Sequence, residues 1–441
     1  MERMVFLLNL SLSGIKNIEK EIRIDFYGKT VNKSSSFENH SIKAIYGENG
    51  SGKTAIITAI SIVKSFIIDE SYLSDPRNLE LLKALINKRT KRFLFRCEFV
   101  TNIEEFFIHE YEVCFEIDKN DEVFVTYESL KERMNSSKNA QKLLFCSENG
   151  MFSALNLSEE SSNTIIEKTK NLLTKRSAIM SMMNVFREAS QIKTPHELAY
   201  SFIFFVMLYT QLDVEDSHTY YYHKARIGKL INEDMSADSQ MMKSLLEEVY
   251  QDIRTTERKV PIESFEAYER RIKKLESFIR LFKPTLKKID IDKTVNKEVY
   301  ECRLIMDYGS YSIDSEFEST GIKRIMNMFN AFGFASNYGV VFIDELDSNI
   351  NGIYLNKLIE YFGNYGKGQL CFTSHNTEPM SILKQKSKAI DFLANDNRII
   401  PWVKNGHYTP DSSYRNGMIE GLPFNIDSSD FISVFDWEGQ E

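Results

Sequence analysis

The feature that most constrains this chain is the run Gly47–Thr54 (GENGSGKT), which fits the pattern GxxxxGK[ST]. An apolar stretch, residues 42–46, precedes this run, and a helix-forming stretch, residues 55–66, follows it. This context is typical of a phosphate-binding loop, because glycines allow close approach of the backbone and a helix N-terminus carries positive potential. We therefore predict a strand, a phosphate-binding loop and a helix over residues 42–66.

The individual residues of the loop have distinct expected roles. Lys53 is predicted to reach the β- and γ-phosphates of a nucleotide, and the Thr54 hydroxyl is predicted to ligate Mg²⁺. The remaining predicted nucleotide-binding residues of the loop are Asn49, Gly50, Ser51 and Gly52.

Two further apolar runs end in residues suited to phosphate chemistry. Residues 340–343 (VVFI) predict a buried strand that delivers Asp344 and Glu345 at its carboxyl end. Asp344 is placed for a metal ion and Glu345 for an attacking water. The run 369–373 is followed by His375, which we expect to contact the γ-phosphate or to hold the water. Taken alone, these residues also fit a turn after a strand and a structural histidine.

The order of these motifs resembles the ABC-type ATPase heads of the SMC, RecF and OLD-like group. More narrowly, it resembles the bacterial AAA15/AAA21 ATP-binding proteins associated with phage defence, such as the AbiL-type and PARIS AriA ATPases. The resemblance covers about residues 1–130 and 285–425. The motifs that carry it are Gly47–Thr54, Glu318–Gly321 (ESTG), Phe342–Ser348 (FIDELDS), Thr373–His375 (TSH) and the segment from Tyr414 to Pro423.

The resemblance implies a fold, cofactors and an assembly. It implies an α/β fold: an ABC-type P-loop ATPase head, made of a mixed sheet and an antiparallel β subdomain, with a helical insert. ATP and Mg²⁺ would lie between two facing heads of a homodimer or higher homo-oligomer. Ser319 and Gly321 would act on the partner's nucleotide, and Asn351 would lie at the dimer seam. Asp344 would hold Mg²⁺, Glu345 would polarise water and His375 would be the switch histidine.

The chain departs from the family pattern at three places. The early arginine of SMC-like heads is replaced at Gly14–Asn17, where Lys16 is the nearest cation. No glutamine occurs between Thr54 and Gln141, so the usual Q-loop ligand is missing or replaced. The signature reads Ser-Thr-Gly in place of Ser-Gly-Gly-Gln. We therefore expect slow, regulated hydrolysis.

The distribution of apolar residues predicts three regions. Residues 1–130 form the N-terminal part of the head, with an antiparallel meander over 92–127, and residues 289–441 form its C-terminal part. Residues 131–288 are predicted to form a helical insert or arm, whose clearest helix is the apolar series from Phe265 to Phe282. The apolar run Ala199–Leu212 is interpreted as a buried helix, because it is shorter than the roughly 20 residues that span a bilayer.

Composition limits the partners. A net charge of -8 excludes a polycationic surface, so DNA contact would need a local patch. One such patch is residues 261–288, with eight basic and four acidic residues. Five scattered cysteines without a CxxC pair favour a reducing cytoplasm, and no membrane contact is expected.

The residues after His375 bear on the biological role. Only 66 residues follow it, too few for the TOPRIM nuclease domain of OLD-type proteins, and Asp391, Asp396 and Asp411 are interpreted as lying in solvated loops. The resemblance thus favours a sensor or scaffold ATPase that controls a separate toxic effector, a TOPRIM-type nuclease, in phage defence. The alternative is a RecF- or SMC-like clamp that binds DNA directly in repair or maintenance.

Overall fold

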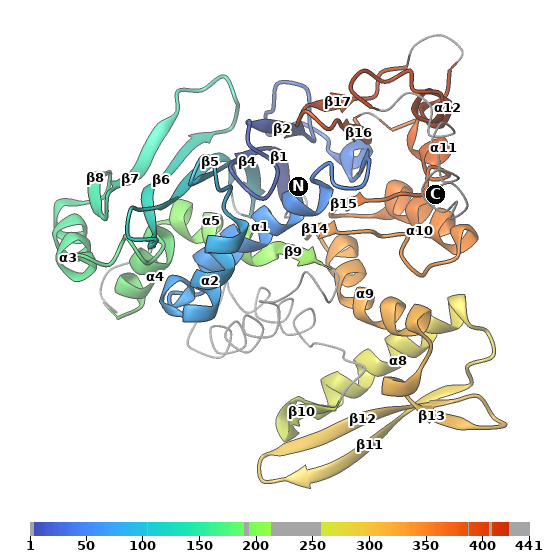
Figure 1. The fold of residues 1–441 in the computed structure, drawn as a ribbon. Helices are drawn as coiled ribbons and strands as arrows, with labels where there is room; N and C mark the ends of the chain where they lie inside the picture. The colour runs from blue at the N-terminus through green and yellow to red at the C-terminus, as the bar shows by residue number, and fades with distance from the viewer. Residues whose placement is uncertain are drawn as a thin grey trace, which may run out of the picture.

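The computed structural model describes residues 4–103, 105–188, 194–212, 257–386, 388–404 and 408–422. This part of the chain forms three sheets with helices between and around them (Figure 1). Two sheets share one hydrophobic core, and the third belongs to a lobe with a smaller core of its own. The predicted fold class, an α/β head with a mixed sheet and an antiparallel β subdomain, is confirmed.

The largest sheet has seven antiparallel strands in the order β2-β1-β4-β5-β6-β7-β8. Its central strands alternate buried and less buried residues because one face packs on the core. The antiparallel meander predicted over 92–127 is confirmed. The strands are β1 (Met4–Ser13), β2 (Ile22–Asp25), β4 (Arg92–Asn102), β5 (Phe106–Ile117), β6 (Val123–Met134), β7 (Lys142–Glu148) and β8 (Met151–Leu155).

The second sheet has six strands in the order β17-β16-β3-β15-β14-β9. All neighbours pair in parallel except β17, which is antiparallel to β16. Strands β3, β14 and β15 are buried along their whole length, as their continuous apolar runs predicted. The strands are β3 (Ile42–Gly47), β9 (Leu208–Gln211), β14 (Val340–Ile343), β15 (Gln369–Thr373), β16 (Ile390–Leu393) and β17 (Ile399–Pro401).

Helices and one buried amide join the two sheets. The Phe99 ring of β4 stacks on the Phe204 ring of α5, with 3.8 Å between their centroids, and α5 also contacts α1. The Gln369 side chain of β15 accepts from the Leu7 N–H of β1 at 2.6 Å and donates to the Leu7 carbonyl at 3.0 Å. The helices are α1 (Lys53–Ile68), α2 (Pro76–Leu85), α3 (Glu159–Thr169), α4 (Ala178–Glu188), α5 (His196–Met207), α10 (Gly352–Tyr365), α11 (Met380–Leu383) and α12 (Pro410–Arg415).

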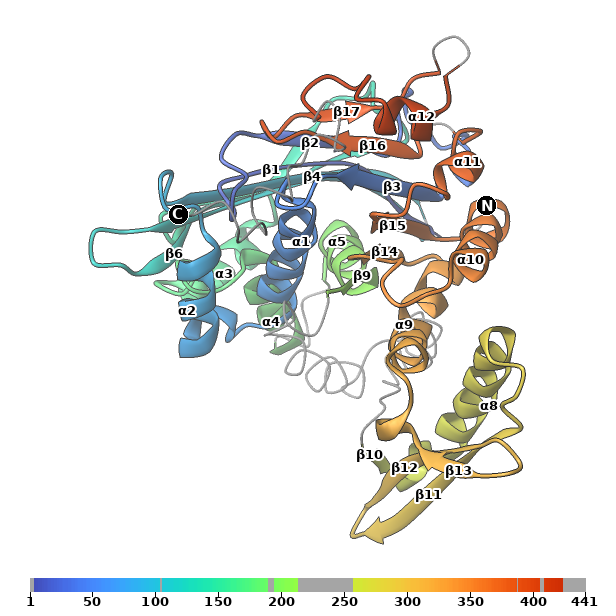
Figure 2. The same cartoon turned by 45° about the vertical axis from the view of Figure 1, so that its right-hand side comes forward.

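The third sheet forms a lobe that lies apart from the two large sheets (Figures 1 and 2). Its core consists of α8, the sheet and the first turns of α9. The helix predicted over 265–282 is confirmed as α8. Its apolar series faces this sheet. The elements are β10 (Arg258–Pro261), α8 (Phe265–Phe282), β11 (Lys288–Asn296), β12 (Val299–Asp307), β13 (Ser312–Asp314) and α9 (Thr320–Ser336).

The segment 131–288, predicted to be a helical insert, also contains strands. β7 and β8 extend the antiparallel sheet, and β9 completes the parallel one. The run Ala199–Leu212, predicted to be one buried helix, is α5 followed directly by β9. The physical reason is that a helix and a strand that are both fully buried give one uninterrupted apolar run, which periodicity alone cannot divide.

A buried carboxyl fixes the start of α4 against the antiparallel sheet. Glu128 of β6 accepts hydrogen bonds from the Tyr111 hydroxyl (3.1 Å), the Ser177 hydroxyl (2.9 Å) and the Ala178 N–H (2.7 Å). Burial outweighs these three donors and raises the pKa of Glu128 to about 7.

We expect Glu128 to make the protein less stable as pH rises. Below about pH 4.5 the carboxyl is protonated in both states. Between about pH 4.5 and 7 the unfolded chain releases the proton that the folded chain still holds, so the unfolding free energy falls by about 3 kcal/mol in total. Urea unfolding of wild type and Glu128→Gln across this range checks the prediction. Apart from changing the unfolding free energy by an amount that does not depend on pH, Glu128→Gln should remove the fall between about pH 4.5 and 7. Parallel pH profiles for the two proteins would therefore contradict the prediction.

Candidate functional site

The loop between β3 and α1 has a backbone that glycine permits. Gly50 has φ 79° and Gly52 has φ 112°, both in the left-handed region, and Gly52 precedes α1 without a side-chain cap on the helix. The Asn17 side-chain amide donates to the Gly50 carbonyl at 2.6 Å and holds the loop from outside. The first N–H groups of α1 therefore remain available to an anion.

Lys53 begins α1 and lies under this loop. Its ammonium donates to the carbonyls of Gly47 and Glu48, both at 2.8 Å. Burial lowers the pKa of Lys53, and the carboxylates of Asp344 and Glu345 are close enough to oppose that shift. The Lys53 ammonium at the loop therefore interacts electrostatically with the carboxylates at the carboxyl end of β14.

Thr373, the last residue of β15, bonds to both acidic residues that follow β14. Its hydroxyl donates to Asp344 Oδ1 at 2.6 Å and accepts from the Glu345 N–H at 2.8 Å. The Asp344 side chain is 2 % exposed, whereas that of Glu345 is 43 % exposed. Glu345 has a left-handed φ of 47°, a backbone conformation that is uncommon for a non-glycine residue. Neighbouring residues therefore present one buried and one accessible carboxylate.

His375 lies beside the accessible carboxylate. Its Nε2 is 4.0 Å from Glu345 Oε1. Asp347 fixes the backbone here, because its carboxylate accepts from the N–H groups of His375 (3.2 Å) and Asn376 (3.0 Å). The structure thus brings Lys53, Asp344, Glu345 and His375 together at the loop.

The other predicted site residues lie at two different helix N-termini. Ser319 caps α9 by accepting from the Ile322 N–H at 3.5 Å, and Asn351 caps α10 by accepting from the Ile353 N–H at 3.0 Å. A Cβ on Gly321 would lie 3.0 Å from the Asn349 carbonyl, so these two helix starts are adjacent. Within the described ranges, no hydrogen bond joins Ser319, Gly321 or Asn351 to residues 47–54.

Two residues at this site are not among those predicted from the sequence. Gln211 ends β9 beside β14, and its carbonyl accepts from the Asp344 N–H at 2.9 Å. Arg324 of α9 donates to the carbonyls of Asp344 (2.8 Å) and Glu345 (3.2 Å). The signal for Gln211 is a glutamine at the end of an apolar run, but it lies beyond the interval 54–141, in which the Q-loop glutamine was expected.

The polar groups left over at the loop fit a phosphate and a hard metal ion. In the described part of the chain, the Ser51 hydroxyl is buried without a hydrogen-bond partner. The Thr54 hydroxyl and the Asp344 carboxylate have oxygen atoms, the donors that Mg²⁺ prefers. The Gln211 amide oxygen is a third such atom, and in this structure it accepts from the Tyr209 hydroxyl at 3.3 Å.

Comparison with known proteins identifies a family. Residues 42–381 match the AAA_21 family, described as "AAA domain, putative AbiEii toxin, Type IV TA system". No curated protein matches the chain. In the described ranges, no helix has both the length and the apolar character needed to cross a membrane.

Several solved structures share a low level of similarity with the chain. An SMC head bound to the C-terminal winged-helix domain of ScpA has a TM-score of 0.42 and 11 % identity, over 92 % of this chain and 99 % of that chain. RecF bound to ATP has a TM-score of 0.39 and 12 % identity, over 91 % and 98 %. The SMC head domain from Thermotoga maritima has a TM-score of 0.34 and 13 % identity, over 90 % and 100 %.

Proposed function

The chain belongs to this family of AAA domains, and from that premise we propose that it binds ATP with Mg²⁺ at residues 47–54 and hydrolyses it. The observation that carries the proposal is the convergence of Lys53, Asp344 and Glu345 on one loop, with Thr373 bonded to both acidic residues. A buried cation, a buried carboxylate and an accessible carboxylate are suited to bind phosphates, to hold Mg²⁺ and to orient an attacking water in phosphoryl transfer.

Each residue has a proposed role in this reaction. Lys53 leaves its two loop carbonyls to bind the β- and γ-phosphates, and the loop N–H groups from Asn49 to Gly52 bind the phosphate oxygens. Thr54, Asp344 and Gln211 would hold Mg²⁺, which would neutralise charge on the phosphates when bound. Glu345, half-exposed beside the loop, accepts a proton from the attacking water.

His375 and the two helix caps have proposed roles at the far side of the phosphates. His375 donates to the γ-phosphate from its position 4.0 Å from Glu345. Ser319 and Asn351 cap their own helices, and Gly321 lies in the first turn of α9. We assign these three residues to the nucleotide of a second copy. ATP would then lie between two heads and hold them as a homodimer.

The biological role we propose is a switch in a toxin–antitoxin type of system. The family description names such a system, and an ATP-dependent homodimer can hold a separate effector in one nucleotide state and release it in the other. The effector we propose is a nuclease on a separate chain.

The test is the mass of the Glu345→Gln protein with and without ATP and Mg²⁺. Glu345→Gln removes the proton acceptor, so we expect hydrolysis to fall by about 10²- to 10⁴-fold while ATP stays bound and the mass doubles. Glu160→Gln on the exposed surface of α3 is the matched control and should hydrolyse ATP like wild type. Unchanged hydrolysis in Glu345→Gln, or a monomer saturated with ATP, would contradict the proposal.

Purification of Glu345→Gln together with the product of the neighbouring gene tests the role. A second polypeptide bound in one nucleotide state supports the effector switch. An ATP-dependent dimer that carries DNA and no second polypeptide would replace it with the clamp function.

A further inference from the structure

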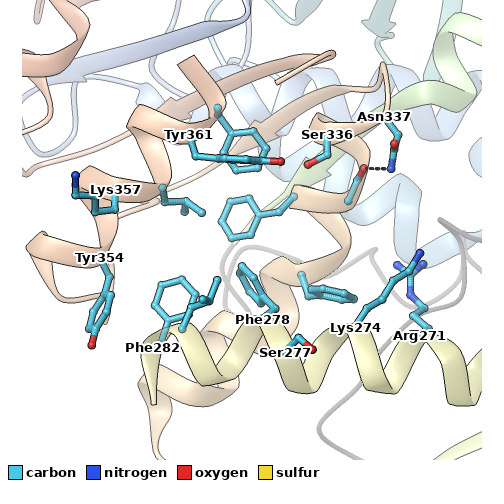
Figure 3. Close-up of a pocket in the computed structure, with 16 residues that line it drawn as sticks. Arg271, Lys274, Ser277, Phe278, Phe282, Ser336, Asn337, Tyr354, Lys357 and Tyr361 are labelled. Carbon is cyan, nitrogen blue, oxygen red and sulfur yellow. Dashed lines mark hydrogen bonds between the residues drawn. The ribbon is translucent and has the colours of Figure 1, made fainter. Parts of the chain in front are cut away.

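A groove of about 640 Å³ lies between α8 of the lobe, α10 of the head and α9, which runs between the two. Figure 3 shows Phe278 and Phe282 of α8 facing Tyr354 and Tyr361 of α10 across it. The Phe282 and Tyr354 rings are in contact, with 5.3 Å between their centroids. The groove is separate from the loop 47–54, and none of the sixteen residues that line it is a proposed site residue.

The groove exposes apolar groups to solvent. The side chain of Leu281 is 66 % exposed and that of Tyr361 is 48 % exposed, although both line a concave surface. The Phe278 ring lies 5.4 Å from Phe329 and 5.1 Å from Phe282, so the floor is aromatic. An exposed, concave aromatic surface of this kind is typical of a site that binds another peptide segment.

The charge of the groove selects the kind of segment that fits. Its sixteen lining residues include three cations and no carboxylate. The cations are Arg271, Lys274 and Lys357. Arg271 donates to Asn330, and Lys357 pairs with the exposed Glu360 at 2.9 Å. A segment that combines aromatic side chains with negative charge complements both properties.

The chain contains one segment with that composition near its C-terminus. Residues 424–441 include five acidic residues and no lysine, arginine or histidine. They also include four aromatic residues, Phe424, Phe431, Phe435 and Trp437. We propose that residues 424–441 bind intramolecularly in the groove between α8, α9 and α10.

The length of the segment allows this. Residues 423–441 follow Leu422, the last described residue, and 19 residues span up to about 60 Å when extended. A domain of this length has a radius of gyration of about 22 Å, so the reach covers its diameter. Figures 1 and 2 both show α12, α10 and α8 along one side of the molecule. The described chain continues past α12 to Leu422, and Gly421 lies close to Ala394 and Arg398.

Binding in the groove would connect the lobe to the head. α8 contributes one wall and α10 the other, so a bound segment contacts both and restrains the lobe. α9, whose first turns carry Ser319 and Gly321, lies between these walls. This inference goes beyond the proposed ATPase function and does not depend on it.

The tryptophans of the chain provide the test. The chain has two, Trp402 and Trp437, so the full-length Trp402→Phe protein reports on Trp437 alone. We expect Trp437 fluorescence at shorter wavelength, and weaker quenching by acrylamide, than in the same protein unfolded in urea. The groove variant adds Leu281→Glu and Tyr361→Glu, which place two carboxylates against an acidic segment at exposed positions. It should shift Trp437 to the unfolded-state values.

The matched control adds Val295→Glu and Ile166→Glu, two exposed apolar positions outside the groove, and should leave the fluorescence unchanged. An equal shift in the control, or Trp437 already exposed in the parent protein, would overturn the proposal. A spectrum that changes on dilution would also overturn it and assign the groove to the segment of a second copy. Circular dichroism of the groove variant must match that of the parent, since loss of fold would produce the same shift.

Discussion

Replacing Lys53 with methionine should weaken ATP binding by about 10²- to 10⁴-fold. A hydrogen bond to a charged group contributes about 1.5–3 kcal/mol, and the Lys53 ammonium is positioned to make two such bonds to phosphate oxygens. The structure supports this role because the ammonium is held on the loop by two 2.8 Å bonds to the Gly47 and Glu48 carbonyls. Methionine keeps the buried stem of the side chain and removes only the charge.

Isothermal titration with ATP and Mg²⁺ measures this change, and Lys83→Met on α2 provides the control. Lys83 is half-buried and pairs with Asp121 at 3.4 Å, so its loss removes the same charge from another helix. We expect that control to bind ATP like wild type. If Lys53→Met binds ATP within threefold of Lys83→Met, the loop is not the nucleotide site.

The parts of the site that could be predicted from sequence are those formed by short contiguous motifs. The strands β3, β14 and β15 are buried on both faces, so each appears as an unbroken apolar run, and the functional residues follow directly. Lys53, Asp344 and His375 were found in this way. The roles assigned to Ser319, Gly321 and Asn351 stay predictions, because they concern a second copy.

The parts that could not be predicted depend on neighbours distant in sequence. β9 has only four residues and follows α5 without a break, so nothing local marks it as a strand. Its place beside β14 gives Gln211 its position, and that pairing joins residues more than 130 positions apart. Arg324 was missed for a similar reason, because its partners are backbone carbonyls of another element.

Asp391 shows the same limit and was interpreted wrongly from the sequence. It was expected in a solvated loop, but it lies in β16 with its side chain 1 % exposed. Its partner is Lys43 of β3, also buried, and the ammonium lies 2.6 Å from the carboxylate. The two residues are 348 positions apart, so no sequence window contains both. Asp396 is exposed and pairs with Arg398. Asp411 was also expected in a loop, but it lies in the first turn of α12 and accepts from the Thr409 hydroxyl at 2.6 Å.

The Asp391→Ala variant should lose about 3–5 kcal/mol of unfolding free energy. The substitution leaves the Lys43 ammonium buried without its counter-ion, and an uncompensated buried charge has a cost of that size. Asp396→Ala is the matched control, because it removes an equally short ion pair at the surface. An exposed pair contributes about 0–1 kcal/mol, so this variant should unfold almost like wild type. Urea unfolding of the three proteins provides the measurement.

A double variant distinguishes the cost of an unpaired buried ammonium from the contribution of the intact ion pair. Lys43→Met with Asp391→Leu replaces both buried ions by apolar side chains of similar volume, and such replacements are often neutral or stabilising. We therefore expect the double variant to recover most of the stability that Asp391→Ala loses. Lys43 lies on β3, which leads into the loop 47–54. ATP binding by the double variant should match wild type, because the replacement keeps the packing of β3 against β16. If the double variant is as unstable as Asp391→Ala, then packing around β16, and not the unpaired ammonium, causes the loss.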